Sequence, residues 1–189
     1  MRTLIRAAAV GAAIAATALV APQAIAQNAS AASVTSAGEQ HIAGTDVQLS
    51  AKGARDARTR AVAGANPVAV AAAATLCGSG YKLDNAEQLP DSRRFGTLFT
   101  YTKYVGGVHG VCSVFDNNLG TAKHMKLKLC AGLVALGCKT DEGTFKDYAG
   151  PVKIESRDSM AVNCPPVTAI MWSDSVAIID RARSATACD

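Results

Sequence analysis

The stretch Phe95-Gly-Thr-Leu-Phe-Thr-Tyr-Thr-Lys-Tyr-Val105 is followed by Gly106-Gly107 and then by Gly110-Val-Cys-Ser-Val-Phe115, and these residues decide the fold. Both longer segments are rich in β-branched and aromatic residues, which are typical of strands. The two glycines between them suit a tight turn, because glycine adopts positive φ without strain. We therefore predict a strand that enters a turn and a second strand that returns from it.

Downstream, residues 121–129 alternate between apolar and basic side chains, which indicates a half-buried strand of an antiparallel sheet. The apolar face holds Met125, Leu127 and Leu129, and the basic face holds His124, Lys126 and Lys128. Residues 131–137 fit either a strand or one helical turn. Further short strands are predicted at 144–148, 152–155, 160–164, 167–172 and 176–179. Strands at this spacing predict an all-β fold, an antiparallel sandwich or barrel.

The aromatic residues are unevenly placed along the 189-residue chain. All of them lie between Tyr81 and Trp172, so the apolar core is expected there. Residues 27–75 contain no aromatic residue and no cysteine, and small side chains dominate them. Such a segment lacks the apolar bulk that offsets the entropy of ordering it. We therefore predict a disordered Ala-rich leader or propeptide at residues 27–75 and one β domain at residues 76–189.

The first 26 residues have the pattern of a cleaved secretory signal peptide. Arg2 and Arg6 form a basic start, residues 7–20 are apolar, and Ala24-Ile-Ala26 matches the small-residue cleavage pattern. No apolar run of membrane-spanning length follows, so no transmembrane segment is expected after the signal is removed. Removing two of the 19 basic residues leaves 17 against 15 acidic ones, which is too even to predict a nucleic-acid or membrane-surface partner from charge. We expect a secreted protein, either extracellular or attached to the surface of the spore or cell.

Six cysteines follow the predicted signal peptide, an even number in a chain bound for an oxidising compartment. We therefore predict that all of them form disulfides, each contributing about 2–4 kcal/mol to the free energy of unfolding. The sequence leaves the pairing open, although the third and fourth cysteines are close enough to close a small local loop. The six are Cys77, Cys112, Cys130, Cys138, Cys164 and Cys188.

Catalytic and metal-binding patterns are weak in this sequence. Cys77-Gly-Ser-Gly-Tyr81 partly matches the papain-type nucleophile signature, but a glycine stands at its second cysteine and too few residues follow for the catalytic histidine and asparagine. His109 and His124 have no partner at metal-ligand spacing, and there is no Gly-x-Ser-x-Gly elbow. We interpret His109 as a loop residue and predict no catalytic, cofactor-binding or metal-binding residue. A small extracellular hydrolase is the weakest alternative.

Two segments are candidate binding sites. The basic strand face fits an anionic cell-wall polymer, and it equally fits a solvated face whose lysines protect a sheet edge. Its members, with nearby residues, are Lys123, His124, Lys126, Lys128 and Trp172. The segment Cys164-Pro-Pro-Val167 is stiff and extended because two prolines fix its backbone. It fits either the rigid binding loop of a secreted protease inhibitor, formed by Pro165, Pro166 and Val167, or the start of a strand.

At Asp141-Glu-Gly-Thr-Phe-Lys-Asp-Tyr-Ala-Gly-Pro-Val152, taken with Cys77-Gly-Ser-Gly-Tyr81, the chain resembles the spore-associated protein A family of small secreted proteins from filamentous actinomycetes. The resemblance extends from about Cys77 to Cys188 and departs from the family pattern at Cys164-Pro-Pro-Val167. It implies a secreted protein found with spores or aerial growth and carries over no catalytic residue. We therefore expect a non-enzymatic structural or binding protein whose partner is a cell-wall or spore-surface polymer. In the inhibitor alternative, the partner is an extracellular protease.

Overall fold

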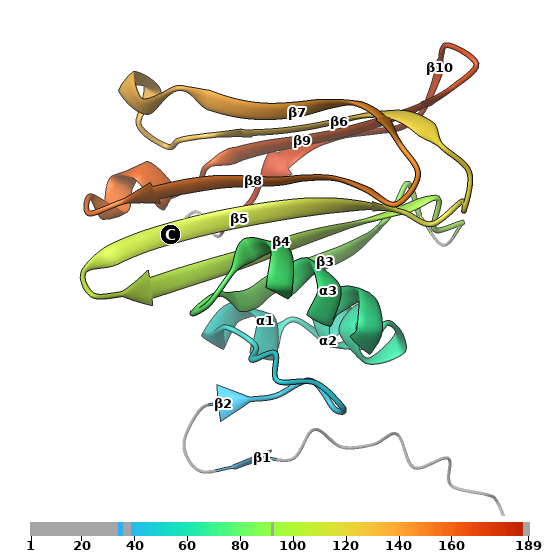
Figure 1. Cartoon of the computed structure of the whole chain (residues 1–189). Coiled ribbons are helices and arrows are strands. Elements are labelled where there is room, and N and C mark those ends of the chain that lie inside the picture. Colours follow the sequence, from blue (N-terminus) through green and yellow to red (C-terminus); the bar gives the residue numbers. More distant parts are fainter. Residues whose placement is uncertain (1–33, 36–38, 92, 187–189) are drawn as a thin grey trace, which may run out of the picture.

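The computed structural model describes residues 34–35, 39–91 and 93–186. The predicted signal peptide, residues 27–33 of the predicted leader and Cys188 lie outside these residues. Two antiparallel sheets of four strands face one another, and short helices cover the far side of one of them (Figure 1). The predicted all-β, disulfide-containing sandwich is therefore confirmed.

The two sheets differ in what covers them. The helix-covered sheet has the strand order β3–β4–β5–β8, and the outer sheet has the order β10–β9–β6–β7. The predicted hairpin forms in the first, because Val105 pairs with Val108 across Gly106 and Gly107, which both have positive φ. A short pair, β1 (Val34–Thr35) and β2 (Glu39–Gln40), precedes the sheets. The sheet strands are β3 (Lys82–Leu89), β4 (Gly96–Val105), β5 (Val108–Asn117), β6 (Lys123–Cys130), β7 (Cys138–Phe145), β8 (Tyr148–Ser156), β9 (Pro166–Ser173) and β10 (Val176–Ser184).

The main core lies between the two sheets and is built from alternate positions of each strand. Met125, Leu127 and Leu129 of β6 are fully buried, which confirms the inward face predicted for this strand. They belong to one cluster with Leu98 and Phe115 from the opposite sheet. The alternation of apolar and polar residues along β6 thus sets which face of the outer sheet meets solvent.

Three helices form a third layer on the other face of the helix-covered sheet, below it in Figure 1: α1 (Ala51–Arg55), α2 (Ala57–Ala65) and α3 (Pro67–Cys77). Val62 and Val70 are buried in a cluster with Phe99 and Tyr101 of β4. The hydroxyl of Tyr101 also donates a 2.7 Å hydrogen bond to the carbonyl of Val70. No single helix in the described part of the chain is long and apolar enough to cross a membrane; only α2 and α3 taken together, with a bend of 102°, meet such a criterion.

The helices correct the prediction of a disordered segment within residues 51–75. The segment itself has little apolar bulk, but the sheet supplies that bulk through Phe99 and Tyr101, and small side chains allow the helices to pack closely on them. Removal of residues 27–75 as a propeptide stays a prediction.

Several sequence-predicted elements differ in detail from the structure. The strand predicted at 144–148 is the turn region between β7 and β8, and the strand predicted at 160–164 is replaced by the 3-10 turn η2 (Ser159–Val162). Residues 131–137 contain the 3-10 turn η1 (Val134–Leu136), the helical alternative for this segment. Strands β3 and β7 were not predicted, because polar side chains hide their alternation.

Two disulfides tie these layers and loops together. Cys77–Cys112 joins the end of α3 to β5, and Cys130–Cys138 closes the loop between β6 and β7, as its short spacing predicted. Cys164 is also disulfide-bonded, and none of the described cysteines is free. These bonds are consistent with an extracellular protein.

Candidate functional site

The outer sheet brings two predicted binding residues together on its solvent-facing side. In the strand register, His124 of β6 lies between Trp172 of β9 and Thr144 of β7. The rings of His124 and Trp172 are 4.8 Å apart between centroids, in a tilted arrangement. Alternation in β6 points His124 outward because Met125, the next residue, points into the core.

The lysines of this face are partly neutralised. Lys126 Nζ lies 2.8 Å from one carboxylate oxygen of Glu142, and His124 Nε2 lies 3.4 Å from the other. The hydrogen bond from Lys126 is the largest cause that holds the pKa of Glu142 below its usual range. Lys123, which by alternation in β6 does not share the face of His124 and Lys126, donates from Nζ to Ser173 Oγ at 3.0 Å. The face predicted as a basic strip is therefore a mixed surface of charges and hydroxyls.

The registers of β6, β7 and β9 define a continuous surface, which we call the Trp172 platform. It combines one indole and one imidazole ring with threonine hydroxyls and charged groups, all on one side of the outer sheet. Such a surface offers apolar ring faces together with hydrogen-bond donors and acceptors. Its members are His124, Lys126, Lys128, Thr140, Glu142, Thr144, Thr168, Ile170 and Trp172.

The second predicted site, Cys164-Pro-Pro-Val167, is not a protruding loop. Pro165 is buried, and Pro166 is the first residue of β9, where it pairs with Ser184 of β10. Val167 is fully buried and lies between Leu129 and Arg183 in the outer sheet. A proline at the first position of a strand forfeits no interior ladder bond. The segment therefore has the strand-start geometry, which gives no support to an inhibitory loop.

A groove at one end of the sandwich contains residues that the sequence analysis set aside. Tyr104 and His109 are opposite residues of the β4–β5 hairpin, with ring centroids 4.4 Å apart. They line a cavity of about 730 Å³, and Val162 and Thr186 are also part of its lining. His109 is thus a strand residue and not the loop residue predicted. The sequence contained a signal for this pairing, because Tyr104 and His109 are each two residues from the turn glycines Gly106 and Gly107 and therefore lie opposite one another in a hairpin.

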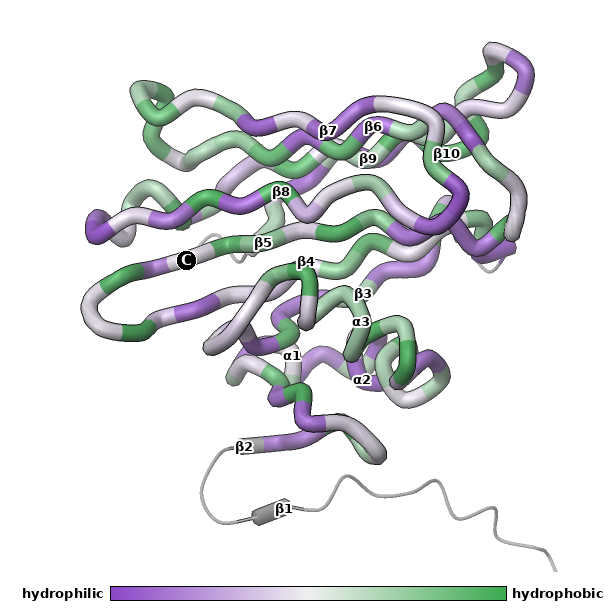
Figure 2. Tube along the Cα trace, in the orientation of Figure 1, coloured by the Kyte–Doolittle hydropathy of each residue, from purple (hydrophilic) through white to green (hydrophobic). Residues whose placement is uncertain are grey.

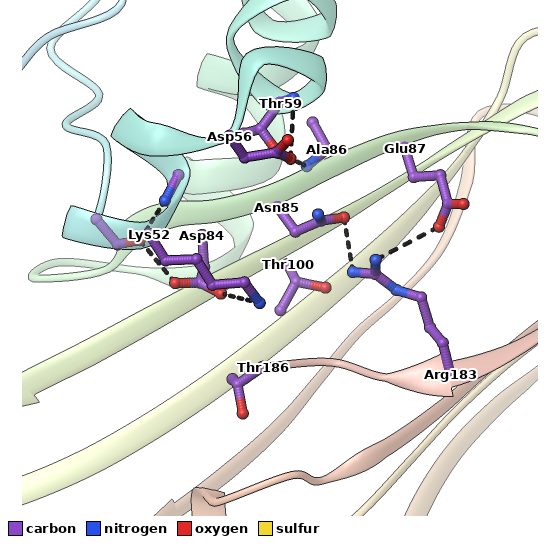
Figure 3. A network of polar contacts seen from close by, with 12 residues as sticks. Lys52, Asp56, Thr59, Asp84, Asn85, Ala86, Glu87, Thr100, Arg183 and Thr186 are labelled. Carbon is purple, nitrogen blue, oxygen red and sulfur yellow. Dashed lines mark hydrogen bonds and ion pairs between the residues drawn. The ribbon is translucent and has the colours of Figure 1, made fainter. Parts of the chain in front are cut away.

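A polar seam joins the edge strands of the two sheets, β3 and β10 (Figure 3). Glu87 is 6% exposed, and its carboxylate oxygens lie 2.8 Å from Arg181 Nη2 and 3.5 Å from Arg183 Nη1. Arg183 Nη2 donates to Asn85 Oδ1 at 2.6 Å. Burial lowers the pKa of Arg183, and the charge of Glu87 opposes that effect. Because these groups are enclosed between elements, we assign the seam a structural role.

Thr59 of α2 and Gln48 in the segment before α1 satisfy backbone donors on the free edge of β3. The backbone N–H of Ala86 donates to Thr59 Oγ1 at 3.2 Å, and that of Leu83 donates to the carbonyl of Gln48 at 2.8 Å. Both donors face away from β4, the neighbouring strand of β3 in its sheet. Unpaired strand N–H groups carry a free-energy penalty when buried, so these two bonds help to hold the helices on the sheet.

Asp116 of β5 is a carboxyl group whose pKa is raised into the neutral range. Burial, and then the charge of Asp147, raise its pKa to about 7. Between the unfolded value of 3.8 and about 7, the folded state holds a proton that the unfolded state has released. The free energy of unfolding therefore falls as pH rises through this window.

We expect Asp116→Asn to remove this pH dependence. At pH 8 the variant should be more stable than the wild type, by on the order of 1–3 kcal/mol, because no carboxylate is then ionised at this half-buried position. At pH 4 the two proteins should have nearly equal stability. Urea unfolding at both pH values measures this. A variant that is less stable at pH 8 contradicts the prediction, since it would mean that the ionised carboxylate is favourable in the fold.

The comparisons with known proteins do not assign a site. Comparison of the chain with models of protein families, with curated proteins and with solved structures finds no match. Within the described ranges, no three metal-ligating side chains gather at one place. The membership of the chain in the spore-associated protein A family stays a prediction from its motifs.

Proposed function

We propose that this is a non-enzymatic secreted protein of the spore or cell surface that binds a surface polymer on the Trp172 platform. The observation that carries the proposal is the contact between Trp172 and His124 on a solvent-facing sheet surface. The disulfides Cys77–Cys112 and Cys130–Cys138 support an extracellular location. The family resemblance points to the same compartment.

The side chains around the two rings fit a polysaccharide that carries phosphate. An indole ring has a large apolar face on which the C–H face of a sugar can stack. Thr140, Thr144 and Thr168 supply hydroxyls on the same surface, and these both donate and accept hydrogen bonds. Lys128 lies between two of these threonines and makes no ion pair with a described residue, so its ammonium is available to an anionic group.

Trp172 provides its own test, because it is the only tryptophan of the chain. Titrating the protein with isolated phosphate-bearing cell-wall polymer should shift the tryptophan emission. Trp172→Ala should weaken binding to washed spores or hyphae by about tenfold or more, since stacking and burial of the ring are lost. Val68→Ala is the matched control, because Val68 of α3 is an exposed apolar residue outside the platform.

The proposal fails if the emission does not change while the protein still sediments with spores. It also fails if Trp172→Ala and Val68→Ala bind equally well. Polymer from which the phosphate groups have been removed separates the two chemical contributions. Lys128→Ala should weaken binding of the intact polymer and leave binding of the phosphate-free polymer unchanged.

A further inference from the structure

Apolar side chains gather in solvent at one end of the sandwich. Eight large apolar side chains are exposed in the described part of the chain, and five of them lie on the β4–β5 hairpin, η1 or η2. In Figure 1 these three segments lie at the left end of the sandwich, and Figure 2 shows apolar colouring at the loop tip between β6 and β7. The five form what we call the apolar end: Tyr104 (69% exposed), Val105 (57%), Val134 (93%), Leu136 (56%) and Met160 (54%).

The three segments are neighbours in space as well as at the same end of the fold. The backbone N–H of Gly132, before η1, donates to the carbonyl of Ala161 in η2 at 2.9 Å. A side chain at Gly132 would collide with the backbone carbonyl oxygens of Met160 and Asn163, so the segment that leads into η1 is in direct contact with η2. The hairpin faces η2 across the groove that Tyr104 and Val162 both line.

The loops that carry these apolar side chains are restrained. Cys130–Cys138 closes the segment that carries η1, and the carboxylate of Asp158 caps η2 by accepting a 2.9 Å hydrogen bond from the backbone N–H of Met160. Exposed apolar side chains on restrained loops lose little conformational entropy when they bind.

The charges at this end favour an anionic surface. Lys139 follows the Cys130–Cys138 loop, and Arg157 precedes η2; both are exposed, and neither makes an ion pair with a described residue. A lysine on the β4–β5 hairpin, Lys103, is already neutralised by Glu155, with Nζ and Oε1 2.6 Å apart. The apolar end is therefore bordered by two cations without an ion pair, Lys139 and Arg157, and by one carboxylate, that of Asp158, so its net charge is positive.

We propose that the apolar end docks on the surface of an anionic lipid bilayer. Val134, Leu136 and Met160 enter the boundary between head groups and acyl chains, and Tyr104 lies at the head-group level with its polar tip in water. Lys139 and Arg157 contact anionic head groups. Tips on three separate segments, with a groove between them, fit a fluid surface that flows around them better than the single matched surface of a protein partner. This activity is independent of the Trp172 platform.

Flotation with lipid vesicles tests the proposal at about 0.15 M salt. The wild type should float with vesicles that contain phosphatidylglycerol and phosphatidylcholine. Val134→Asp combined with Leu136→Asp should reduce the bound fraction about tenfold, because it places two carboxylates at the bilayer boundary. The matched control is Leu119→Asp combined with Val176→Asp, which changes exposed apolar residues at the opposite end and should bind like the wild type. All four altered positions are exposed, and thermal unfolding confirms that both variants fold.

Further variants test the contribution of charge and distinguish the bilayer from other binding partners. Lys139→Glu combined with Arg157→Glu should weaken binding to phosphatidylglycerol vesicles, and pure phosphatidylcholine should bind the wild type more weakly than the mixture. Trp172→Ala should float like the wild type, which keeps this test separate from the polymer-binding proposal. No flotation of the wild type, or equal losses in the variants of the two ends, overturns the proposal. A wild-type dimer that Val134→Asp/Leu136→Asp converts to a monomer, without any vesicle binding, overturns it in favour of a second copy of the chain.

Discussion

Replacing Glu87 by glutamine should lower the free energy of unfolding by about 3–5 kcal/mol. Glu87 is buried at the polar seam, where its two carboxylate oxygens lie close to Arg181 and Arg183. Glutamine keeps the size of the side chain but removes the charge. The guanidinium of Arg183, whose side chain is 18% exposed, is then left without its ionic partner. Urea unfolding followed by Trp172 fluorescence measures the loss.

Two further variants show whether the pairing itself is responsible. Arg58→Gln is the control, because Arg58 lies 4.0 Å from Glu87 and its side chain is 73% exposed; it should change stability by less than about 1 kcal/mol. Glu87→Gln combined with Arg183→Met should recover part of the loss, since the unpaired charge is then removed as well. If the double variant is less stable than the sum of the two single changes predicts, the explanation by an unpaired buried charge is wrong.

A chain that consists only of residues 76–189 should fail to fold cooperatively. These residues contain both sheets and agree with the domain boundary that the composition predicts. Without the helices, however, Phe99, Tyr101 and Val114 on the helix-covered sheet lose their covering. The buried valines of α2 and α3 alone contribute about 1.5–3 kcal/mol each, against a typical net stability of about 5–15 kcal/mol. Gel filtration and urea unfolding should show aggregates and no sharp transition.

The control for this truncation is a chain that begins at Val34, which retains every described element. It should unfold in one sharp transition at the same urea concentration as the longer chain. A truncated chain of residues 76–189 that remains monomeric and unfolds cooperatively would restore the predicted boundary near residue 75.

The elements predicted correctly are those whose signal is local. The β4–β5 hairpin follows from β-branched and aromatic residues around Gly106-Gly107, and the faces of β6 follow from strict alternation at Met125, Leu127 and Leu129. The Cys130–Cys138 bridge follows from short spacing. In each case, neighbouring residues supply the pattern and the rest of the fold need not be known.

The helical layer and β3 depend on distant partners and were missed for that reason. Glu87 and Asn85 give β3 the composition of an exposed segment, but arginines on β10 compensate both of them. The alanine-rich helices lack bulk of their own and obtain it from the sheet. Neither the contact of β3 with β10 nor the contact of the helices with the sheet can be recognised from the residues of one segment alone.

The candidate sites show the same division. Alternation predicts that His124 faces solvent, but only the register of β6 with β9 places it against Trp172. Sequence spacing likewise gives no sign that Glu142 neutralises Lys126, or that three loops carry exposed apolar residues to one end. Contacts across strands and loops arise from topology, which the residue order does not determine locally.

The hydrogen bonds that β3 donates to Thr59 and Gln48 also bear on how the protein behaves at high concentration. An edge strand with unoccupied N–H groups is a template on which a strand of another copy can add. While α2 and the segment before α1 remain in place, these two donors of β3 are occupied and that route to edge-to-edge association is blocked. A cut that releases α2 or the residues around Gln48 would open it, so proteolysis in this region should produce a species whose aggregation rises steeply with concentration.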